Sequence, residues 1–203
     1  RAALTPEQVE ALVLVGAFDA LAPHRGRREL LWQLLAVAAE RADTPCLFES
    51  DEPPVTFPEP DTVEQTFLDY AILGFCLDRH LMELWARQRE LLRVVPAARL
   101  RTLRHGTSAR VAGLVVCRQA PPTARGVLFL TLEDETGLVN VIVPPPVREQ
   151  YRTLLRRQPV LVIDGRVERQ GTLASLVAEE VRTLGRPVGP LAERVGSLSH
   201  DFR

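Results

Sequence analysis

Three carboxylates stand side by side between two apolar runs in the stretch FLTLEDETGLVNVIV, residues 129–143. Glu133, Asp134 and Glu135 have the chemistry of cation ligands or of an acid–base pair, because both kinds of site use carboxylate oxygens. Thr136 and Gly137 follow, and glycine supplies the positive φ that a hairpin turn needs. No histidine accompanies the three acids. The sequence therefore favours a solvated hairpin tip over a metal site.

No other group of residues has the spacing of a catalytic or metal site. There is no CxxC pair, no GxGxxG and no GxxxxGK[ST] phosphate loop. The histidines and cysteines are scattered: His24, His80, His105, His200, Cys46, Cys76 and Cys117. We therefore expect no catalytic residue, no metal and no cofactor in this chain, and the cysteines are typical of a reduced cytosolic protein.

Composition limits the classes of partner. The chain has 203 residues and a net charge of −1, so any attraction to nucleic acid must come from local patches. All 25 basic residues are arginines, whose planar fork suits phosphate and base edges. No apolar run reaches the length of a membrane span, and no signal peptide is visible. Because residue 1 is arginine, we expect a piece of a longer chain.

The first 42 residues have the pattern of a helical hairpin segment. Thr5, Pro6 and Gln8 form a helix start with a capping box. A second helix is predicted after residue 24 from apolar residues at helical spacing. Three arginines lie at its start: Arg25, Arg27 and Arg28. The helix dipole makes this end unfavourable for cations. This basic cluster suggests a phosphate partner or, equally, a solvated basic edge.

The next two segments differ sharply in character. Residues 43–66 contain five prolines and many acids without a balancing arginine, which predicts an acidic, Pro-rich linker. Residues 67–107 return to helical periodicity and predict connector helices. A tail, residues 186–203, follows the last patterned segment.

From residue 108 the apolar period changes to two, which predicts strands. Five strands are expected at 109–119, 127–134, 137–143, 159–169 and 172–184, with a helix at 144–157 between the third and fourth. This order is that of the five-stranded OB-fold β-barrel. The fold class is therefore α+β: a helix-hairpin-helix-like segment, linker and connector helices leading to an OB domain at 108–185.

An OB fold binds oligonucleotides or oligosaccharides across strands 2 and 3 and the loops joining strands 1–2 and 4–5. Arg118, Gln119 and Arg125 flank the first loop, and Arg166 and Arg169 lie at the second. Arginines at both loops favour contact with a phosphate backbone, with solubility as the alternative.

Two strand residues complete the candidate surface. Asn140 is the polar side chain of strand 3 and is suited to face a base. Phe129 is the aromatic of strand 2 and is a candidate stacking platform, although core packing is the favoured alternative. The acids of the 133–135 turn would repel phosphate, so we expect nucleic acid to avoid that tip.

Several stretches resemble one family. ARVAGLVVCRQAPPTARGVLFLTLEDETGLVNVIV looks like the OB domain of bacterial C-family DNA polymerases, closest to their error-prone, ImuC-type branch. VEALVLVGAFDAL resembles the family's helical hairpin, DYAILGFCLDRHLMELW its connector helix, and SHDFR its C-terminal ending. An OB domain from a tRNA-binding protein is the alternative, but it leaves residues 1–105 unexplained.

The resemblance implies a non-catalytic C-terminal region of an error-prone DNA polymerase. It implies contact with single-stranded or primer–template DNA during translesion synthesis in the bacterial cytoplasm, and a magnesium site of the parent polymerase upstream of this chain. It also implies an ImuB-like Y-family partner that reaches the sliding clamp, and docking of that partner is the alternative function. No membrane association is expected.

Overall fold

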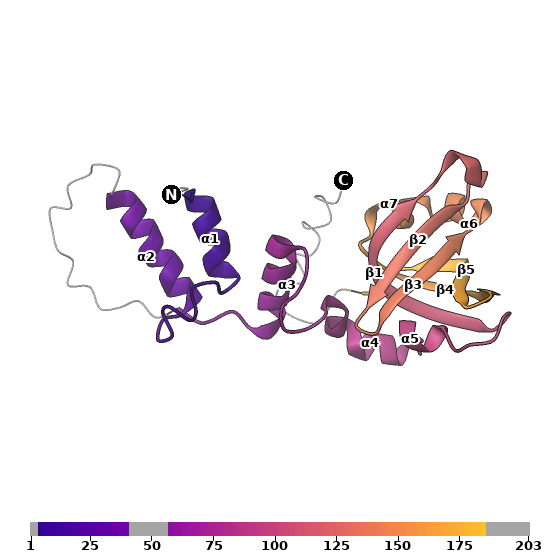
Figure 1. Cartoon of the computed structure of the whole chain (residues 1–203), viewed down its shortest axis with the longest axis horizontal. Coiled ribbons are helices and arrows are strands. Elements are labelled where there is room, and N and C mark those ends of the chain that lie inside the picture. Colours follow the sequence, from indigo (N-terminus) through magenta and orange to yellow (C-terminus); the bar gives the residue numbers. More distant parts are fainter. Residues whose placement is uncertain (1–3, 41–56, 186–203) are drawn as a thin grey trace. The chain divides into compact units, whose positions relative to one another are not determined.

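The computed structural model describes residues 4–40 and 57–185. The chain divides into two compact units, Arg1–Leu77 and Asp78–Arg203. Figure 1 shows the helices of the first unit and the barrel of the second. Most of the predicted linker, the ending SHDFR and His200 lie outside the described residues, as does Cys46.

The first unit contains α1 (Pro6–Leu14), α2 (Arg27–Glu40) and α3 (Thr62–Leu73). The predicted capping box is present: the Gln8 amide donates to Thr5 Oγ1 at 3.3 Å, and the Thr5 amide donates to Gln8 Oε1 at 2.9 Å. The helix α3 begins at Thr62, inside the segment expected to be linker. Its first turn is capped by Asp61, whose side chain accepts from the Glu64 amide at 2.7 Å.

The carbonyl group at the end of α1 is satisfied by side chains from both other helices. Leu14 O accepts from Arg27 Nη1 at 3.1 Å and from Gln65 Nε2 at 3.2 Å. The last carbonyls of a helix lack intrahelical partners, so these two bonds connect α1 to α2 and α3. None of the helices in the described ranges is long and apolar enough to span a bilayer.

The second unit begins with short helical turns: η1 (Leu81–Trp85), α4 (Ala86–Leu91) and α5 (Ala97–Leu100). The predicted connector is therefore split into several pieces. Met82 and Trp85 are buried, at 0% and 3% exposure, and the Trp85 indole donates to Gly185 O at 2.7 Å. These turns thus belong to the barrel unit.

The expected barrel is present. Its strands are β1 (Ser108–Gln119), β2 (Leu128–Asp134), β3 (Gly137–Val143), β4 (Val160–Gln170) and β5 (Leu173–Arg182). They close in the order β1-β2-β3-β5-β4, with β3 and β5 parallel. A 3-10 turn, η2 (Pro122–Ala124), lies in the first loop. The predicted helix between β3 and β4 is divided at Tyr151 into α6 (Pro145–Gln150) and α7 (Arg152–Arg157).

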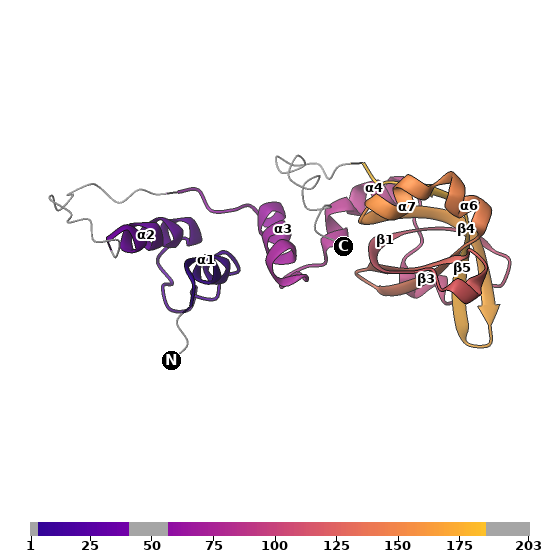
Figure 2. The same cartoon turned by 90° about the horizontal axis from the view of Figure 1, so that it is seen from above.

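Alternating residues of all five strands fill the barrel. Val111, Leu130, Val141, Ile163 and Leu176, one from each strand, are each at most 2% exposed. Gly165 lies where β4 crosses β5, and a Cβ atom there would stand 2.0 Å from Val177 O. Glycine therefore permits the close strand approach that closes the barrel. Figure 2 shows the β4–β5 hairpin and the two helices α6 and α7 at the barrel.

Candidate nucleic-acid interface

The outer face of β2 and β3 carries the predicted strand residues. Phe129 is 38% exposed, whereas its neighbour Leu130 is 2% exposed. Successive side chains of a strand point to opposite faces, so Phe129 lies on the outside of the barrel. Core packing, which the sequence favoured for Phe129, is therefore wrong. Asn140 is also exposed.

Strand register places these residues in two rows across the sheet. One row contains Gln119, Phe129, Ile142 and Val177, which are successive partners on β1, β2, β3 and β5. The adjacent row contains polar partners: Cys117, Thr131, Asn140 and Ser175. Directly opposed residues share a face. The outer face therefore combines one exposed aromatic ring with amide and hydroxyl groups.

Arg118 does not project freely from the first loop. It is the β1 partner of the inward-facing Leu130, and its guanidinium donates to Leu155 O at 2.9 Å and to Gln158 O at 2.6 Å. These carbonyls lie at the end of α7, where a cation is favourable. Burial of the guanidinium lowers the pKa of Arg118 from its ordinary value. The side chain thus holds α7 against β1.

Arg125 is the exposed arginine of the first loop. Its backbone is left-handed, with φ of 50°, and its side chain makes no hydrogen bond or ion pair with any described residue. It remains a candidate for phosphate contact.

The two arginines of the second loop have partners on their own unit. Arg166 Nε lies 2.9 Å from Glu179 Oε1, with both side chains more than half exposed. Arg169 Nη1 donates to Arg101 O at 2.8 Å and to Leu103 O at 3.2 Å. Binding of a phosphate by Arg169 would require these bonds to break, whereas the exposed pair at Arg166 opens at little cost.

The turn between β2 and β3 corrects the expectation of a solvated acidic tip. Asp134 is 5% exposed and accepts from the Ala97 amide at 2.9 Å, at the start of α5. It also accepts from the amide and hydroxyl of Thr136, at 2.8 and 2.6 Å. Glu133 has no such partner within the described ranges. Asp134 is therefore a structural acceptor that joins the hairpin to α5.

Glu135 has an equally specific partner. Its two oxygens accept from Arg89 Nη1 and Nη2 at 2.5 and 2.7 Å, and the Arg89 side chain is 8% exposed. Hydrogen bonds from Arg89 lower the pKa of Glu135, and the same bonds raise the pKa of Arg89. Within residues 4–40 and 57–185, no group of His, Cys, Asp and Glu could hold a metal ion. Because Asp134 and Glu135 bind the Ala97 amide and the Arg89 guanidinium, two of the three acids have structural roles.

The basic cluster of the first unit also has partners. Arg27 binds Asp19, with Nη2 and Oδ2 2.7 Å apart, and this carboxylate raises the pKa of Arg27. Arg28 binds Glu64 Oε1 at 2.6 Å and Pro58 O at 2.7 Å. Arg25 lies near Glu29, with 4.0 Å between the charged atoms. A phosphate at the start of α2 would have to displace these groups.

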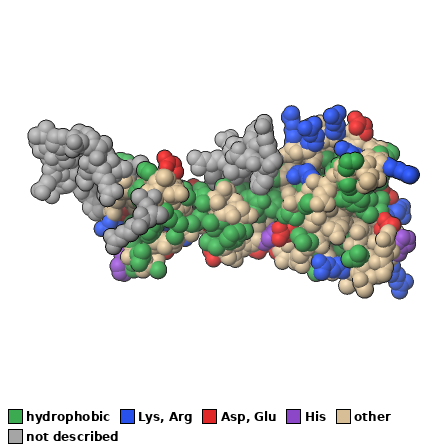
Figure 3. All heavy atoms as spheres, turned by 45° about the horizontal axis from the view of Figure 1, so that its top comes forward, with side chains coloured by type: hydrophobic (Ala, Val, Ile, Leu, Met, Phe, Trp, Pro, Cys, Tyr) green, Lys and Arg blue, Asp and Glu red, His purple; other side chains and the backbone are tan. Residues whose placement is uncertain are grey.

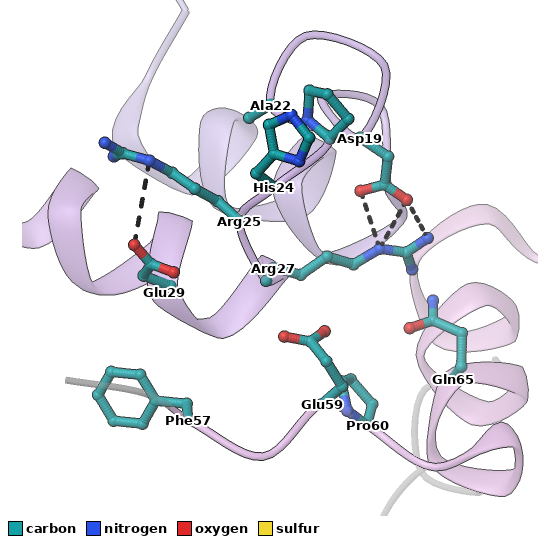
Figure 4. Close-up of a pocket in the computed structure, with 12 residues that line it drawn as sticks. Asp19, Ala22, His24, Arg25, Arg27, Glu29, Phe57, Glu59, Pro60 and Gln65 are labelled. Atoms are coloured by element: carbon teal, nitrogen blue, oxygen red, sulfur yellow. Dashed lines mark hydrogen bonds and ion pairs between the residues drawn. The ribbon is translucent and has the colours of Figure 1, made fainter. Parts of the chain in front are cut away.

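A pocket of about 670 Å³ lies beside this cluster. Figure 4 shows Arg25 and Arg27 on its walls together with three carboxylates, from Asp19, Glu29 and Glu59. Its three carboxylates outnumber its two arginines, so this pocket does not favour an anion.

A second pocket of about 670 Å³ lies in the barrel unit, between the β1–β2 loop and the helices α6 and α7. Four arginines line it: Arg118, Arg148, Arg152 and Arg156. The last three were not among the residues that the sequence predicted for the site. Their four-residue spacing was the available signal, because residues four apart share a helix face.

Comparison with known proteins agrees with this fold. Residues 109–184 match a family described as "OB-fold nucleic acid binding domain". The barrel is thus an OB fold. The asparaginyl-tRNA synthetase of Pyrococcus horikoshii is a weak structural match, with 19% identity over 45% of this chain and 22% of that chain; its TM-score of 0.39 supports no conclusion about function.

The whole chain is also similar to a region of error-prone DNA polymerases. It is 36% identical to the one from Anaeromyxobacter dehalogenans (strain 2CP-1 / ATCC BAA-258) and 38% identical to the one from Azoarcus sp. (strain BH72), over its full length. The chain spans 17% and 18% of those two proteins. The resemblance to error-prone DNA polymerases predicted from the sequence is confirmed.

Proposed function

We propose that the outer face of β1, β2 and β3 binds single-stranded nucleic acid, with a base stacked on Phe129. The observation that carries this proposal is the 38% exposure of that ring on the side of the barrel where OB folds bind oligonucleotides. Gln119 and Ile142 are its strand partners, and the polar row containing Thr131 and Asn140 lies beside it. Stacking is tolerant of sequence because every base has a π face.

The similarity to error-prone polymerases suggests the setting for this binding. We propose that the chain is a non-catalytic accessory region that contacts template or primer–template DNA during translesion synthesis in the bacterial cytoplasm. The aspartates and magnesium of polymerisation would then lie elsewhere in the larger protein.

Replacement of Phe129 tests the proposal. Phe129→Ala should weaken binding of a fluorescent oligothymidylate by roughly 5- to 150-fold, since stacking on an aromatic side chain contributes about 1–3 kcal/mol per base. Leu138→Ala is the matched control, because Leu138 is 47% exposed and lies on β3 beside the acidic turn. Equal losses for the two variants, or no binding by the unmodified chain at low salt, would reject the proposal.

A second candidate function is docking of an ImuB-like Y-family partner, and through it the sliding clamp. The observation that favours it is the apolar component of the same surface: Val116 and Leu138 are each 47% exposed. The two candidates differ in salt dependence, because neutralisation of phosphates releases counterions, whereas burial of apolar side chains does not. Partner capture that is lost in Leu138→Ala and insensitive to salt would support docking.

A further inference from the structure

The arginine-lined pocket of the barrel unit has an unusual balance of charge. Its lining contains four arginines and one carboxylate, Glu149, so the local charge is strongly positive in a chain whose net charge is −1. Figure 3 shows arginine side chains gathered along one edge of the barrel. Such a concentration of one sign in a concave site raises the local concentration of anions.

Two of the arginines form a fixed base. Arg118 donates to carbonyls at the end of α7, and Arg148 Nη1 donates to Gly126 O at 3.0 Å. These bonds hold the β1–β2 loop and the two helices around the pocket. A guanidinium has five N–H donors, so both residues retain donors beyond those used here.

The other two arginines have no internal partner. Arg152 and Arg156 are exposed, line the pocket and make no hydrogen bond or ion pair with any described residue. They lie four residues apart on α7, an arrangement in which like charges repel by about 0.2–0.5 kcal/mol. By contrast, three strand arginines form ion pairs: Arg110 with Asp164, Arg166 with Glu179, and Arg182 with Glu180. An anion between Arg152 and Arg156 would relieve the repulsion.

The pocket adjoins the proposed stacking platform. Ala120 and Leu128 line it, and their chain neighbours Gln119 and Phe129 are opposed in the β1–β2 ladder. A nucleic-acid strand that continued from Phe129 past the end of this ladder would bring its backbone phosphates to the arginines of the pocket.

We infer that this pocket binds a phosphate group, supplied by the backbone of the nucleic acid that stacks on Phe129. The anion site itself stands on the four arginines, whereas the source of the phosphate rests on the proposed function. Arg152 and Arg156 bind the phosphate directly, and Arg118 and Arg148 maintain the shape of the site. Bidentate binding of phosphate oxygens is the typical use of arginine in such sites.

The first experiment measures oligonucleotide binding by the full 203-residue chain across a range of salt. Arg152→Ala/Arg156→Ala should weaken oligothymidylate binding on the order of tenfold and reduce the salt slope by about 1.4, because each contact to single-stranded nucleic acid contributes about 0.7. The control is Arg87→Ala/Arg104→Ala, which removes the same charge from two exposed arginines outside the pocket. The control pair should leave both quantities unchanged.

The second experiment titrates the chain with inorganic phosphate and follows the arginine Nε–H resonances by NMR. The pocket signals should shift in the unmodified chain and in Phe129→Ala, and the signals of Arg87 and Arg104 should not. If no oligonucleotide binds but the pocket signals shift, the proposed function fails, while the anion site stands with free phosphate as its ligand.

Two results would overturn the inference. One is oligonucleotide binding that depends on Phe129 but keeps its affinity and salt slope in Arg152→Ala/Arg156→Ala. The other is a phosphate titration in which pocket and control arginines respond alike.

Discussion

The acidic β2–β3 turn and the arginine-lined pocket are both dense clusters of one charge, but they have opposite relations to the rest of the molecule. In the turn, Asp134 and Glu135 accept hydrogen bonds from a helix amide and from the buried Arg89. In the pocket, Arg152 and Arg156 have no partner among the described residues. Charge with a partner contributes to the fold, whereas charge without one is available to a ligand.

The largest effect is expected at Arg89. Arg89→Met leaves the buried Asp134 and the partly exposed Glu135 without their cation. Removal of one member of a buried ion pair typically destabilises a protein by about 3–5 kcal/mol, and the 31% exposure of Glu135 places the expected loss at the lower end, about 3 kcal/mol. The free energy of unfolding in urea measures it. Arg87→Met, at an exposed position two residues away, should cost less than about 0.5 kcal/mol. A loss at Arg89 as small as the control would show that the acidic turn is not structural.

Asp134 should have the next largest effect. Asp134→Ala leaves the Ala97 amide and the Thr136 groups without their acceptor and should lower the free energy of unfolding by about 2 kcal/mol. Asp134→Asn keeps one acceptor oxygen and should recover part of the loss. If Asn and Ala were equally destabilising, charge rather than hydrogen bonding would be the source of the stability.

Glu135 predicts a dependence of stability on pH. Arg89 holds the folded-state pKa of Glu135 below its ordinary value of 4.5, so its contribution is present above that pH and is lost as the pH falls through the folded pKa. Below pH 4.5, unfolding free energies should fall less steeply for Glu135→Gln than for the unmodified chain. Glu133→Gln is the matched control, and a curve as flat as that of Glu135→Gln would contradict the assignment.

The first loop also contains one arginine with internal partners, Arg118, and one without a partner among the described residues, Arg125. Arg118→Ala removes two hydrogen bonds to the end of α7 and should cost about 1 kcal/mol in unfolding free energy. Arg125→Ala removes no contact with a described residue and should leave stability unchanged. Thermal unfolding of the two variants measures the difference. A similar loss of stability in both would show that the Arg125 side chain is structural as well.

A small effect on stability is also expected in the pocket. Arg152→Ala/Arg156→Ala should change the free energy of unfolding by no more than about 0.5 kcal/mol, because the two side chains repel each other and bind nothing internal. Urea unfolding measures this change. A large destabilisation would show that these arginines, like the acids of the turn, have a structural role.

Local patterns in the sequence predicted much of the architecture. The Thr5–Gln8 capping box, the five strands and the helix between the third and fourth follow from signals within a few residues of one another. The connector was predicted less well, because η1 and α4 are set by burial of Met82 and Trp85 in the barrel unit.

The structure changed the details of the candidate site. Phe129 lies in a run, LFLTL, whose residues are apolar on both faces, so alternation alone did not tell which side is outside. Arg169 looked available in sequence, yet it donates to carbonyls 66 and 68 positions away. Arg148, Arg152 and Arg156 have the spacing of a helix face, but a helix face alone does not reveal a pocket.

The sequence by itself determined the succession of strands along the chain, the turn at Gly137 and the start of α1 at its Thr5–Gln8 capping box, because propensity and capping act over a few neighbouring residues. The tertiary structure decided which charges have partners. The acids of the turn meet Arg89 and Ala97, which lie 46 and 37 positions away in the chain. Closure of the barrel and docking of the short helices bring those groups together, and the same closure leaves Arg152 and Arg156 facing a pocket.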